Sequence, residues 1–105
     1  MKVALYTGRH EIVDEEGKEI TYGIYDDLPF TMDFLPMEQH AASFLLANRD
    51  KHHMDIYVTG FTPALTSLLV AFNRLMYYER PSNLTLHHFD RDSGGYLPQT
   101  WFLRE

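Results

Sequence analysis

The chain contains no cysteine among its 105 residues. This excludes disulfide bonds and metal sites built from thiolates, and it agrees with a cytoplasmic location. The chain also has no run of about 20 apolar residues, the length that a membrane-spanning helix needs. The apolar run at the amino terminus is too short for a secretory signal, so we expect no membrane partner.

Basic residues are also few. Nine lysines and arginines stand against fifteen carboxylates, which gives a formal net charge of −6. Proteins that bind duplex DNA usually present a basic face, so we expect no duplex DNA partner. Net charge does not locate individual groups, and a local basic pocket formed by Arg9, Arg74 and Arg91 stays open.

The chain shows no repeat, no low-complexity segment and no linker, and its length matches one domain, residues 1–105. Apolar residues make up 45% of the chain and aromatic residues 14%, which suffices for a folded core and argues against disorder. A chain of this length buries only a modest core. Dimerisation is therefore an option, since it would add stability and help to build a site.

The hydrophobic pattern predicts an α/β fold: a small Rossmann-like mixed sheet with two helices and an N-terminal β-hairpin. Apolar, β-prone segments predict strands at 2–7, 54–59, 84–89 and 96–103, and a hairpin of 11–13 with 19–25 around the turn D-E-E-G. Apolar residues at helical spacing predict helices at 37–48 and 62–78. Because a helix joins strands 54–59 and 84–89, these two strands should be parallel.

The sequence T-G-F-T-P at 59–63 links a strand to a helix. Gly60 allows close approach of a ligand, while Thr62 suits the N-cap and Pro63 the first helical position. Free N–H groups and the helix dipole make such a turn a site for anions, to which the Thr59 and Thr62 hydroxyls would add contacts. The Walker and dinucleotide-binding motifs are missing. An ordinary strand-to-helix turn uses the same residues and remains the alternative.

Ligands of open α/β sheets bind at the carboxyl ends of the strands. We therefore expect the residues after strands 2–7, 54–59 and 84–89 to lie close together. Arg91 would contact a phosphate there, or else pair with Asp92 on a solvated turn. The candidate ligand-binding residues are Thr7, Gly8, Thr59, Gly60, Phe61, Thr62, Pro63, Asp90, Arg91 and Ser93.

Residues 54–97 resemble the small CRISPR-associated ring nucleases of the CARF-like type, named for the CRISPR-associated Rossmann fold. In that family a strand ends in S-G-x-x-P, an apolar helix follows, and the next strand ends in Y-D-P-x-x-G. The matching elements here are Thr59-Gly60, Pro63, the helix at 64–78, and Phe89-Asp90 with Gly94. The resemblance implies a homodimer that binds a cyclic oligoadenylate, the second messenger of type III CRISPR systems, in a CRISPR or anti-CRISPR context, and it leaves open whether the ring is cleaved.

The chain departs from the family at two positions. Leu65-Thr66-Ser67 stands where the family has a histidine, and Arg91 stands in place of the proline. Cleavage by attack of a 2′-hydroxyl needs no metal or cofactor, and a general base, an acid or a cation can assist it. We therefore expect His10 to act as acid or base and Arg9 to hold the phosphate.

The remaining histidines are expected to be structural or solvated. Alternation along a strand places His88 in the core with Leu86 and puts His87 on the other face. His40, His52 and His53 are expected to face solvent. A metal site built from His10, His87 and Asp90 is a weaker alternative.

Two other functions remain open. One is a protein-interaction module of the phage or plasmid type. The other is a different small nucleotide- or phosphate-binding enzyme, which fold alone does not distinguish from a ring nuclease. An interaction module would show an exposed aromatic patch away from the strand ends. Its candidate anchors are Tyr22, Tyr25, Phe30, Phe34, Tyr77, Tyr78, Tyr96 and Trp101.

Overall fold

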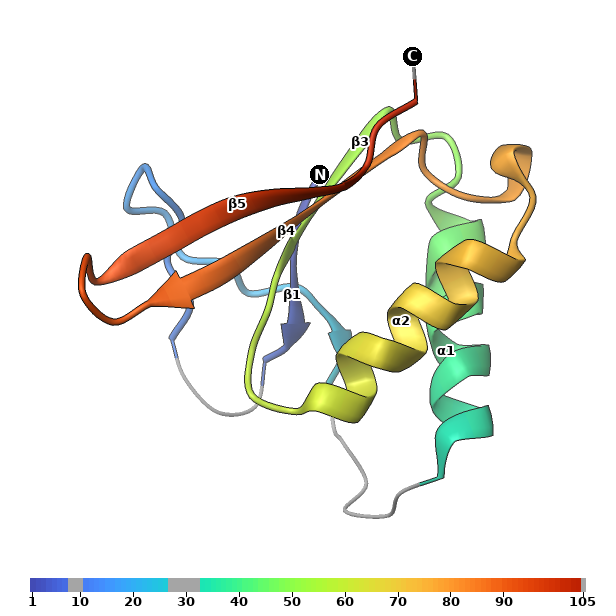
Figure 1. Ribbon diagram of the computed structural model, residues 1–105, viewed down its shortest axis with the longest axis horizontal. Helices are drawn as coiled ribbons and strands as arrows, with labels where there is room; N and C mark the ends of the chain where they lie inside the picture. Colours follow the sequence, from blue (N-terminus) through green and yellow to red (C-terminus); the bar gives the residue numbers. More distant parts are fainter. Residues whose placement is uncertain (8–10, 27–32, 105) are drawn as a thin grey trace.

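The structure is a computed structural model that describes residues 1–7, 11–26 and 33–104. It contains one five-stranded mixed sheet and two α-helices (Figure 1), which confirms the predicted α/β class. In chain order the elements are β1 (Lys2–Tyr6), β2 (Gly23–Tyr25), α1 (Phe34–Ala47), β3 (His53–Tyr57), α2 (Thr62–Arg74), the 3-10 turn η1 (Tyr77–Glu79), β4 (Asn83–Asp90) and β5 (Gly95–Phe102). Neither helix combines the length and apolar character needed to cross a membrane.

The strands lie in the order β2-β1-β3-β4-β5. The first four are parallel, including β3 and β4 as predicted from the helix between them, and β5 returns antiparallel to β4. After β1 the chain continues to β2, which lies on one side of β1 in the sheet. After β3 it continues to β4, which lies in the opposite direction along the sheet. Such a reversal opens a crevice at the carboxyl ends of the two strands between which it occurs. The crevice expected here lies after β1 and β3.

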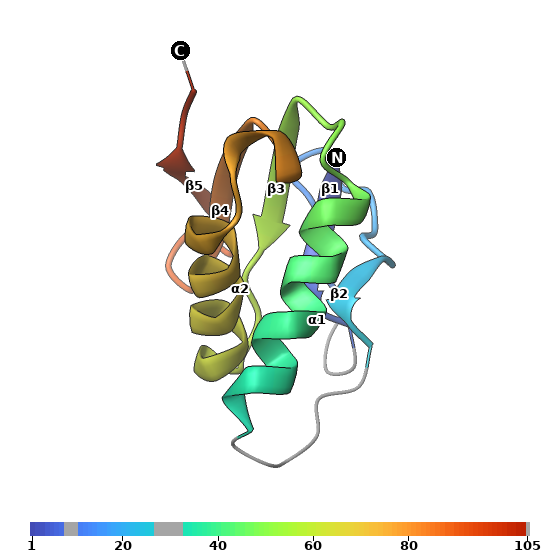
Figure 2. The ribbon, with the colours of Figure 1, turned by 90° about the vertical axis from the view of Figure 1, so that its right-hand side faces the viewer.

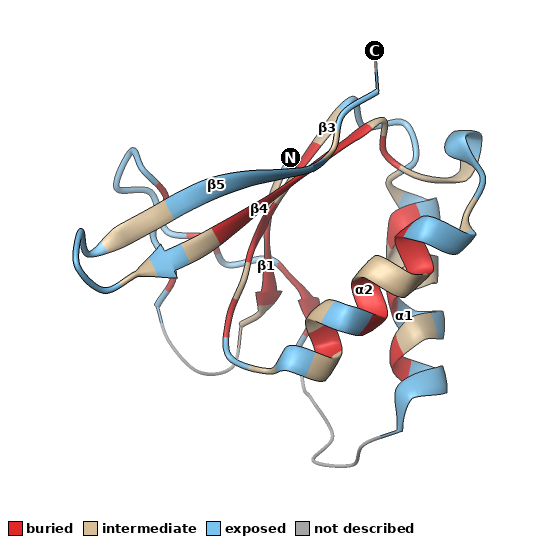
Figure 3. Cartoon of the chain, viewed as in Figure 1, coloured by how far each residue is buried: buried red, intermediate tan, exposed pale blue. Residues whose placement is uncertain are grey.

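Both helices pack side by side on one face of the sheet (Figure 2), so the fold has two main layers. Alternate residues of β1 and β3, such as Val3, Leu5 and Ile56, face the helices and are fully buried. The three central strands and the inner helix faces are buried, while most of β5 is exposed (Figure 3). The hydrophobic pattern therefore places the core between the sheet and the two helices.

The opposite face of the sheet is covered in part by the segment between β1 and β2. Ile12 and Ile20 pack there against Ala4 and Tyr57. The hairpin predicted for this segment is reduced to a single antiparallel bridge between Val13 and Glu19 around a turn at Gly17, whose φ is +79°. The chain then leaves the bridge and joins the main sheet as β2, parallel to β1.

Helix α2 ends at Arg74, four residues earlier than its apolar spacing predicts. Two side chains explain this early end. The Arg80 guanidinium donates a hydrogen bond to the carbonyl of Phe72 in the last turn, and the Glu79 carboxylate accepts the N–H of Met76 at 2.8 Å. Helix α1 begins at Phe34, three residues before the predicted start.

Candidate functional site

A pocket of about 430 Å³ opens at the carboxyl edge of the sheet, beside the crevice that the strand order predicts. It lies between the end of β3 and the β4–β5 hairpin. Three predicted ligand residues, Thr59, Gly60 and Arg91, line it. We call it the carboxyl-edge pocket; its other lining residues are Glu11, Val58, Phe89 and Tyr96.

The backbone after β3 turns sharply to enter α2. Gly60 has a φ of +43°, a region that favours glycine. The Phe61 N–H bonds back to the Thr59 carbonyl at 2.8 Å. Within the described residues the N–H groups of Gly60 and Thr62 have no backbone partner. These two donors and the α2 dipole therefore favour an anion at this turn.

The Thr59 side chain has a structural role that the sequence did not reveal. It is 8% exposed, and its hydroxyl donates to the Tyr6 carbonyl at 3.0 Å, which ties β3 to the end of β1. Its hydrogen is therefore not free to contact a ligand. Among the described residues that line the pocket, the Arg91 guanidinium is the one cationic side chain.

The described lining also includes two aromatic rings and one carboxylate. The rings of Phe89 and Tyr96 lie 5.5 Å apart across the hairpin, and Phe89 is 56% exposed. An exposed ring offers a face on which a nucleobase can stack. The Glu11 carboxylate accepts hydrogen bonds only, so it suits an amine or a hydroxyl of the ligand and repels phosphate. Phe89 and Tyr96 pair directly across the hairpin. Pairing the two strands in the sequence would have placed both rings beside the pocket, and this was overlooked.

Other predicted ligand residues lie elsewhere. Thr62 and Pro63 line a separate groove of about 600 Å³ between the two helices. Helix α2 has Phe61 as its N-cap, with Thr62 as its first residue, and Phe61 packs partly against the core. Thr7 lies against Gly23 of β2. Gly8, Arg9 and His10 fall outside the described residues.

Asp90 and Ser93 build the β4–β5 turn. The Asp90 carboxylate accepts the backbone N–H groups of Asp92 at 3.4 Å and Ser93 at 3.2 Å, and bonds to Ser93 lower its pKa. These bonds orient the turn and so present Arg91 to the pocket. Arg74, which was expected near Arg91 in one alternative, instead pairs with Glu38 at 2.7 Å on the helical layer.

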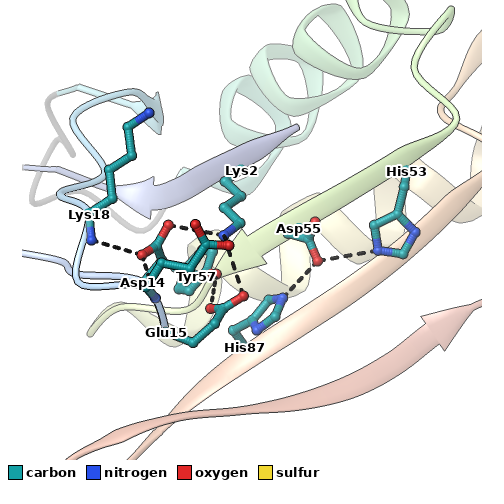
Figure 4. Close-up of polar contacts among 9 residues, drawn as sticks. Lys2, Asp14, Glu15, Lys18, His53, Asp55, Tyr57 and His87 are labelled. Atoms are coloured by element: carbon teal, nitrogen blue, oxygen red, sulfur yellow. Dashed lines mark hydrogen bonds and ion pairs between the residues drawn. The ribbon is translucent and has the colours of Figure 1, made fainter.

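A row of polar side chains crosses the face of the sheet that lies opposite to the two helices (Figure 4). The Lys2 ammonium pairs with Asp14 at 3.0 Å and with Glu15 at 3.3 Å, and the Tyr57 hydroxyl donates to Glu15 at 2.8 Å. The pKa of Asp14 is lowered, first by the Lys18 N–H and then by Lys2. These contacts tie the segment between β1 and β2 to the sheet.

The same face carries a pair of histidines that share one carboxylate oxygen. Nε2 of His87 lies 2.8 Å, and Nε2 of His53 3.2 Å, from Oδ1 of Asp55. His87 is buried and its ring stacks on Tyr57 at 4.4 Å. The prediction that His88 would be the buried histidine was wrong: it is half-buried and bonds Gln99. The sequence has polar residues at the alternate positions 53, 55 and 57, which indicates a polar face on β3. This pattern was overlooked, and it would have predicted a polar partner for His87 on the neighbouring strand.

His53 also departs from its prediction as a solvated loop residue, since it begins β3 and contacts Asp55 and Thr85. His87 and Asp90 cannot share a metal, because they point to opposite faces of β4. In the described part of the chain, no cluster of three or more histidines and carboxylates is placed to hold a metal ion.

Replacing Asp55 by alanine is expected to lower the free energy of unfolding by about 1–3 kcal/mol, because the buried His87 N–H loses its acceptor. Asp55→Asn, which keeps one acceptor oxygen, should cost less. Urea unfolding at neutral pH measures both variants. No measurable loss for Asp55→Ala would show that the hydrogen bond to His87 contributes nothing.

No family model, curated protein or solved structure matches this chain. The resemblance to ring nucleases therefore stays a prediction from the motifs in residues 54–97. The function has to be argued from the geometry of the carboxyl-edge pocket.

Proposed function

We propose that this chain binds a cyclic oligoadenylate in the carboxyl-edge pocket, as a homodimer in the cytoplasm. The observation that carries the proposal is the meeting of Gly60 and Arg91, which are 31 positions apart, around one pocket with exposed aromatic surface. Such a pocket offers separate contacts for the phosphate and the base of a nucleotide.

The charges of the lining residues suggest how a nucleotide would lie. Its phosphate would sit near the Gly60 turn, where backbone N–H groups and Arg91 supply donors. Its base would stack on Phe89, on the side of the pocket where Glu11 accepts hydrogen bonds. Adenine carries an exocyclic amine that suits a carboxylate acceptor. This arrangement keeps the phosphate away from the Glu11 carboxylate.

Cleavage is a separate question from binding. The described lining residues include no histidine, and Glu11 is the one lining carboxylate. The predicted roles of His10 as acid or base and of Arg9 as phosphate clamp remain proposals. Chromatography of cyclic tetra-adenylate after incubation with wild type and His10→Ala tests them. Linear products that disappear in the variant would support both cleavage and the role of His10.

Binding is tested by substituting the cation of the pocket. Arg91→Gln is expected to weaken binding of cyclic tri-, tetra- or hexa-adenylate by about 1.5–3 kcal/mol, roughly tenfold to a hundredfold, because a charged hydrogen bond to phosphate is lost. Titration calorimetry or a gel shift with labelled rings measures the dissociation constant. Wild type should bind at least one ring size at micromolar protein concentration.

Arg74→Gln is the matched control, since it removes the same charge from an exposed arginine outside the pocket. It should bind rings like wild type. Absence of ring binding by wild-type protein would refute the proposal. If ATP or linear oligoadenylate binds more tightly than every ring, the alternative of another small nucleotide-binding protein is favoured.

A further inference from the structure

The two helices form the one layer of the fold that is almost free of charged side chains (Figure 2). With His40 counted as neutral, Glu38 is the only charged residue of α1, and Arg74 is the only one of α2. These two residues pair with each other at 2.7 Å. The helical layer is therefore neutral, and the net charge of −6 lies in the rest of the chain.

Helix α1 is apolar on its outer side as well as on the side that packs on the core. The residues at 35, 39, 42 and 46, spaced by four, three and four positions, share one face of a helix. We call Leu35, Gln39, Ala42 and Leu46 the outer stripe. Leu35 is 59% exposed and Leu46 is 41% exposed. A helix that is apolar on all sides is typical of one that is buried, so the outer stripe lacks a covering partner.

A groove beside the outer stripe extends this apolar surface from α1 to α2. It is the groove of about 600 Å³ between the two helices, and Phe34, which is 48% exposed, forms part of its wall. The residues that α2 contributes are small or medium-sized: Thr62, Pro63, Thr66, Ser67 and Val70. Short side chains let another molecule approach the helix closely. The exposed apolar surface therefore spans both helices.

The spacing of the outer stripe is the same when it is read in either direction. If a second α1 lies antiparallel across a two-fold axis, Leu35 of each copy meets Leu46 of the other, and Gln39 meets Ala42. A two-fold interface requires exactly such a self-complementary surface, in which residue i contacts j and j contacts i. The stripe contains no charged residue, so no like charges face each other in this arrangement.

We infer that a second copy of this chain covers the outer stripe, with the two α1 helices antiparallel. This inference rests on the homodimer of the proposed function and specifies its interface. Two copies that each carry a charge of −6 repel each other, and the neutral helical layer is the face where this repulsion is weakest. Contact there also removes the exposed parts of Leu35 and Leu46 from water.

Sedimentation velocity of the full chain at a series of micromolar concentrations measures the dimer. Leu35→Glu and Leu46→Lys are each expected to raise its dissociation constant about tenfold or more, because each places a charge against a leucine of the other copy. Neither substitution should unfold the protein. A carboxylate in the first turn of a helix and an ammonium near its last turn both interact favourably with the helix dipole.

An equimolar mixture of these two variants tests the antiparallel arrangement. In the mixed dimer the introduced carboxylate meets the introduced ammonium, while the other leucine pair stays intact. The mixture should therefore dimerise more tightly than either variant alone, and added salt should weaken the mixed dimer but not the wild-type dimer. A mixture that dimerises no better than its two components would overturn the arrangement.

Leu97→Glu is the matched control, since Leu97 is 54% exposed but lies on β5, away from the helical layer. This variant should dimerise like wild type, and circular dichroism checks that each variant folds. Monomeric wild type at every concentration would overturn the inference, in favour of a different protein or an apolar ligand on this face. A dimer that both leucine substitutions in α1 leave intact, or that Leu97→Glu weakens equally, would overturn it in favour of another interface.

Ring binding and dimerisation are measured separately. Arg91→Gln should bind cyclic oligoadenylate more weakly and remain a dimer that Leu35→Glu disrupts. Wild type that dimerises through the outer stripe but binds no ring would refute the proposed function and leave this inference standing. Wild type that binds rings as a monomer would refute this inference and leave the ring-binding proposal standing.

Discussion

Raising the pH from neutrality to about 12 is expected to destabilise the protein steeply, because it ionises tyrosines that are buried in the folded state. Burial, and secondarily the charge of Glu38, raises the pKa of Tyr25 from 10.0 to about 12. The Tyr25 hydroxyl donates to the Met37 carbonyl at 2.8 Å, a bond that requires its proton. The pKa of Tyr57 is raised as well, by burial and by its hydrogen bond to Glu15.

The direction of the effect follows from proton binding. The folded state keeps these protons at pH values where the unfolded chain releases them. The stabilisation is therefore fully present below pH 10 and is lost as the pH rises through the folded pKa. A pKa unit corresponds to about 1.4 kcal/mol, so Tyr25 alone is expected to contribute about 2 kcal/mol to this loss. That is a large share of the stability of a domain of this size.

Urea unfolding at a series of pH values between 8 and 12, followed by circular dichroism, measures the loss. Tyrosinate absorbance in the same samples reports the ionisation. Tyr25→Phe should be less stable than wild type at neutral pH, by about 1 kcal/mol for the lost hydrogen bond. The variant should nevertheless lose less stability above pH 10. Tyr78→Phe, at an exposed position, is the control and should match wild type throughout. A flat stability profile for wild type up to pH 12 would contradict the prediction.

The part of the fold that local sequence determines was predicted correctly. Three apolar patterns predicted β3, α2 and β4: the run before Gly60, the face of α2 and the segment 84–89. Because a helix joins the two strands, the patterns also predicted that β3 and β4 pair in parallel. The strands predicted at 84–89 and 96–103 form the antiparallel β4–β5 hairpin, with Gly94 at positive φ in its turn. Each of these elements is long enough for its own hydrophobic period to identify it.

The errors arose where contacts distant in sequence decide the structure. Strand β2 has three residues, too few for a period to appear, and its place beside β1 depends on Gly23. A Cβ at that glycine would lie 2.7 Å from the Thr7 side chain. The end of α2 depends on the hydrogen bond from Arg80 to Phe72, which its apolar spacing cannot reveal. Short strands and helix ends are accordingly the features that sequence reasoning located least well.

The candidate site was predicted in part for the same reason. Topology alone brings the end of β3 to the β4–β5 hairpin, so the meeting of Gly60 with Arg91 was predictable. Glu11 reaches the pocket through the segment after β1, whose path the sequence left open. Thr59 was predicted to bind the ligand, but its hydroxyl is used to join two strands. A hydroxyl next to a ligand-binding turn is therefore ambiguous until its hydrogen-bond partner is known.

Replacing Phe72 by alanine is expected to cost about 3–5 kcal/mol of stability, the usual loss for a buried phenylalanine. Phe72 is fully buried on the inner face of α2, and its ring meets Phe102 of β5 edge to face at 5.6 Å. The same ring supports the Arg80 guanidinium. The substitution therefore opens a cavity between the helix and the sheet, and it also removes one of the two rings that hold the Arg80 guanidinium.

Phe72→Leu separates these two effects. Leucine fills most of the space, so its cost should be less than half that of alanine, but it offers Arg80 no aromatic face. A double-mutant cycle with Arg80→Gln, read by urea unfolding, isolates the contact. Its coupling energy is expected to be about 0.5–2 kcal/mol. A loss below about 1 kcal/mol for Phe72→Ala would mean that the ring is not part of the packed core. A coupling near zero would mean that Phe102 and the Phe72 carbonyl suffice to hold Arg80.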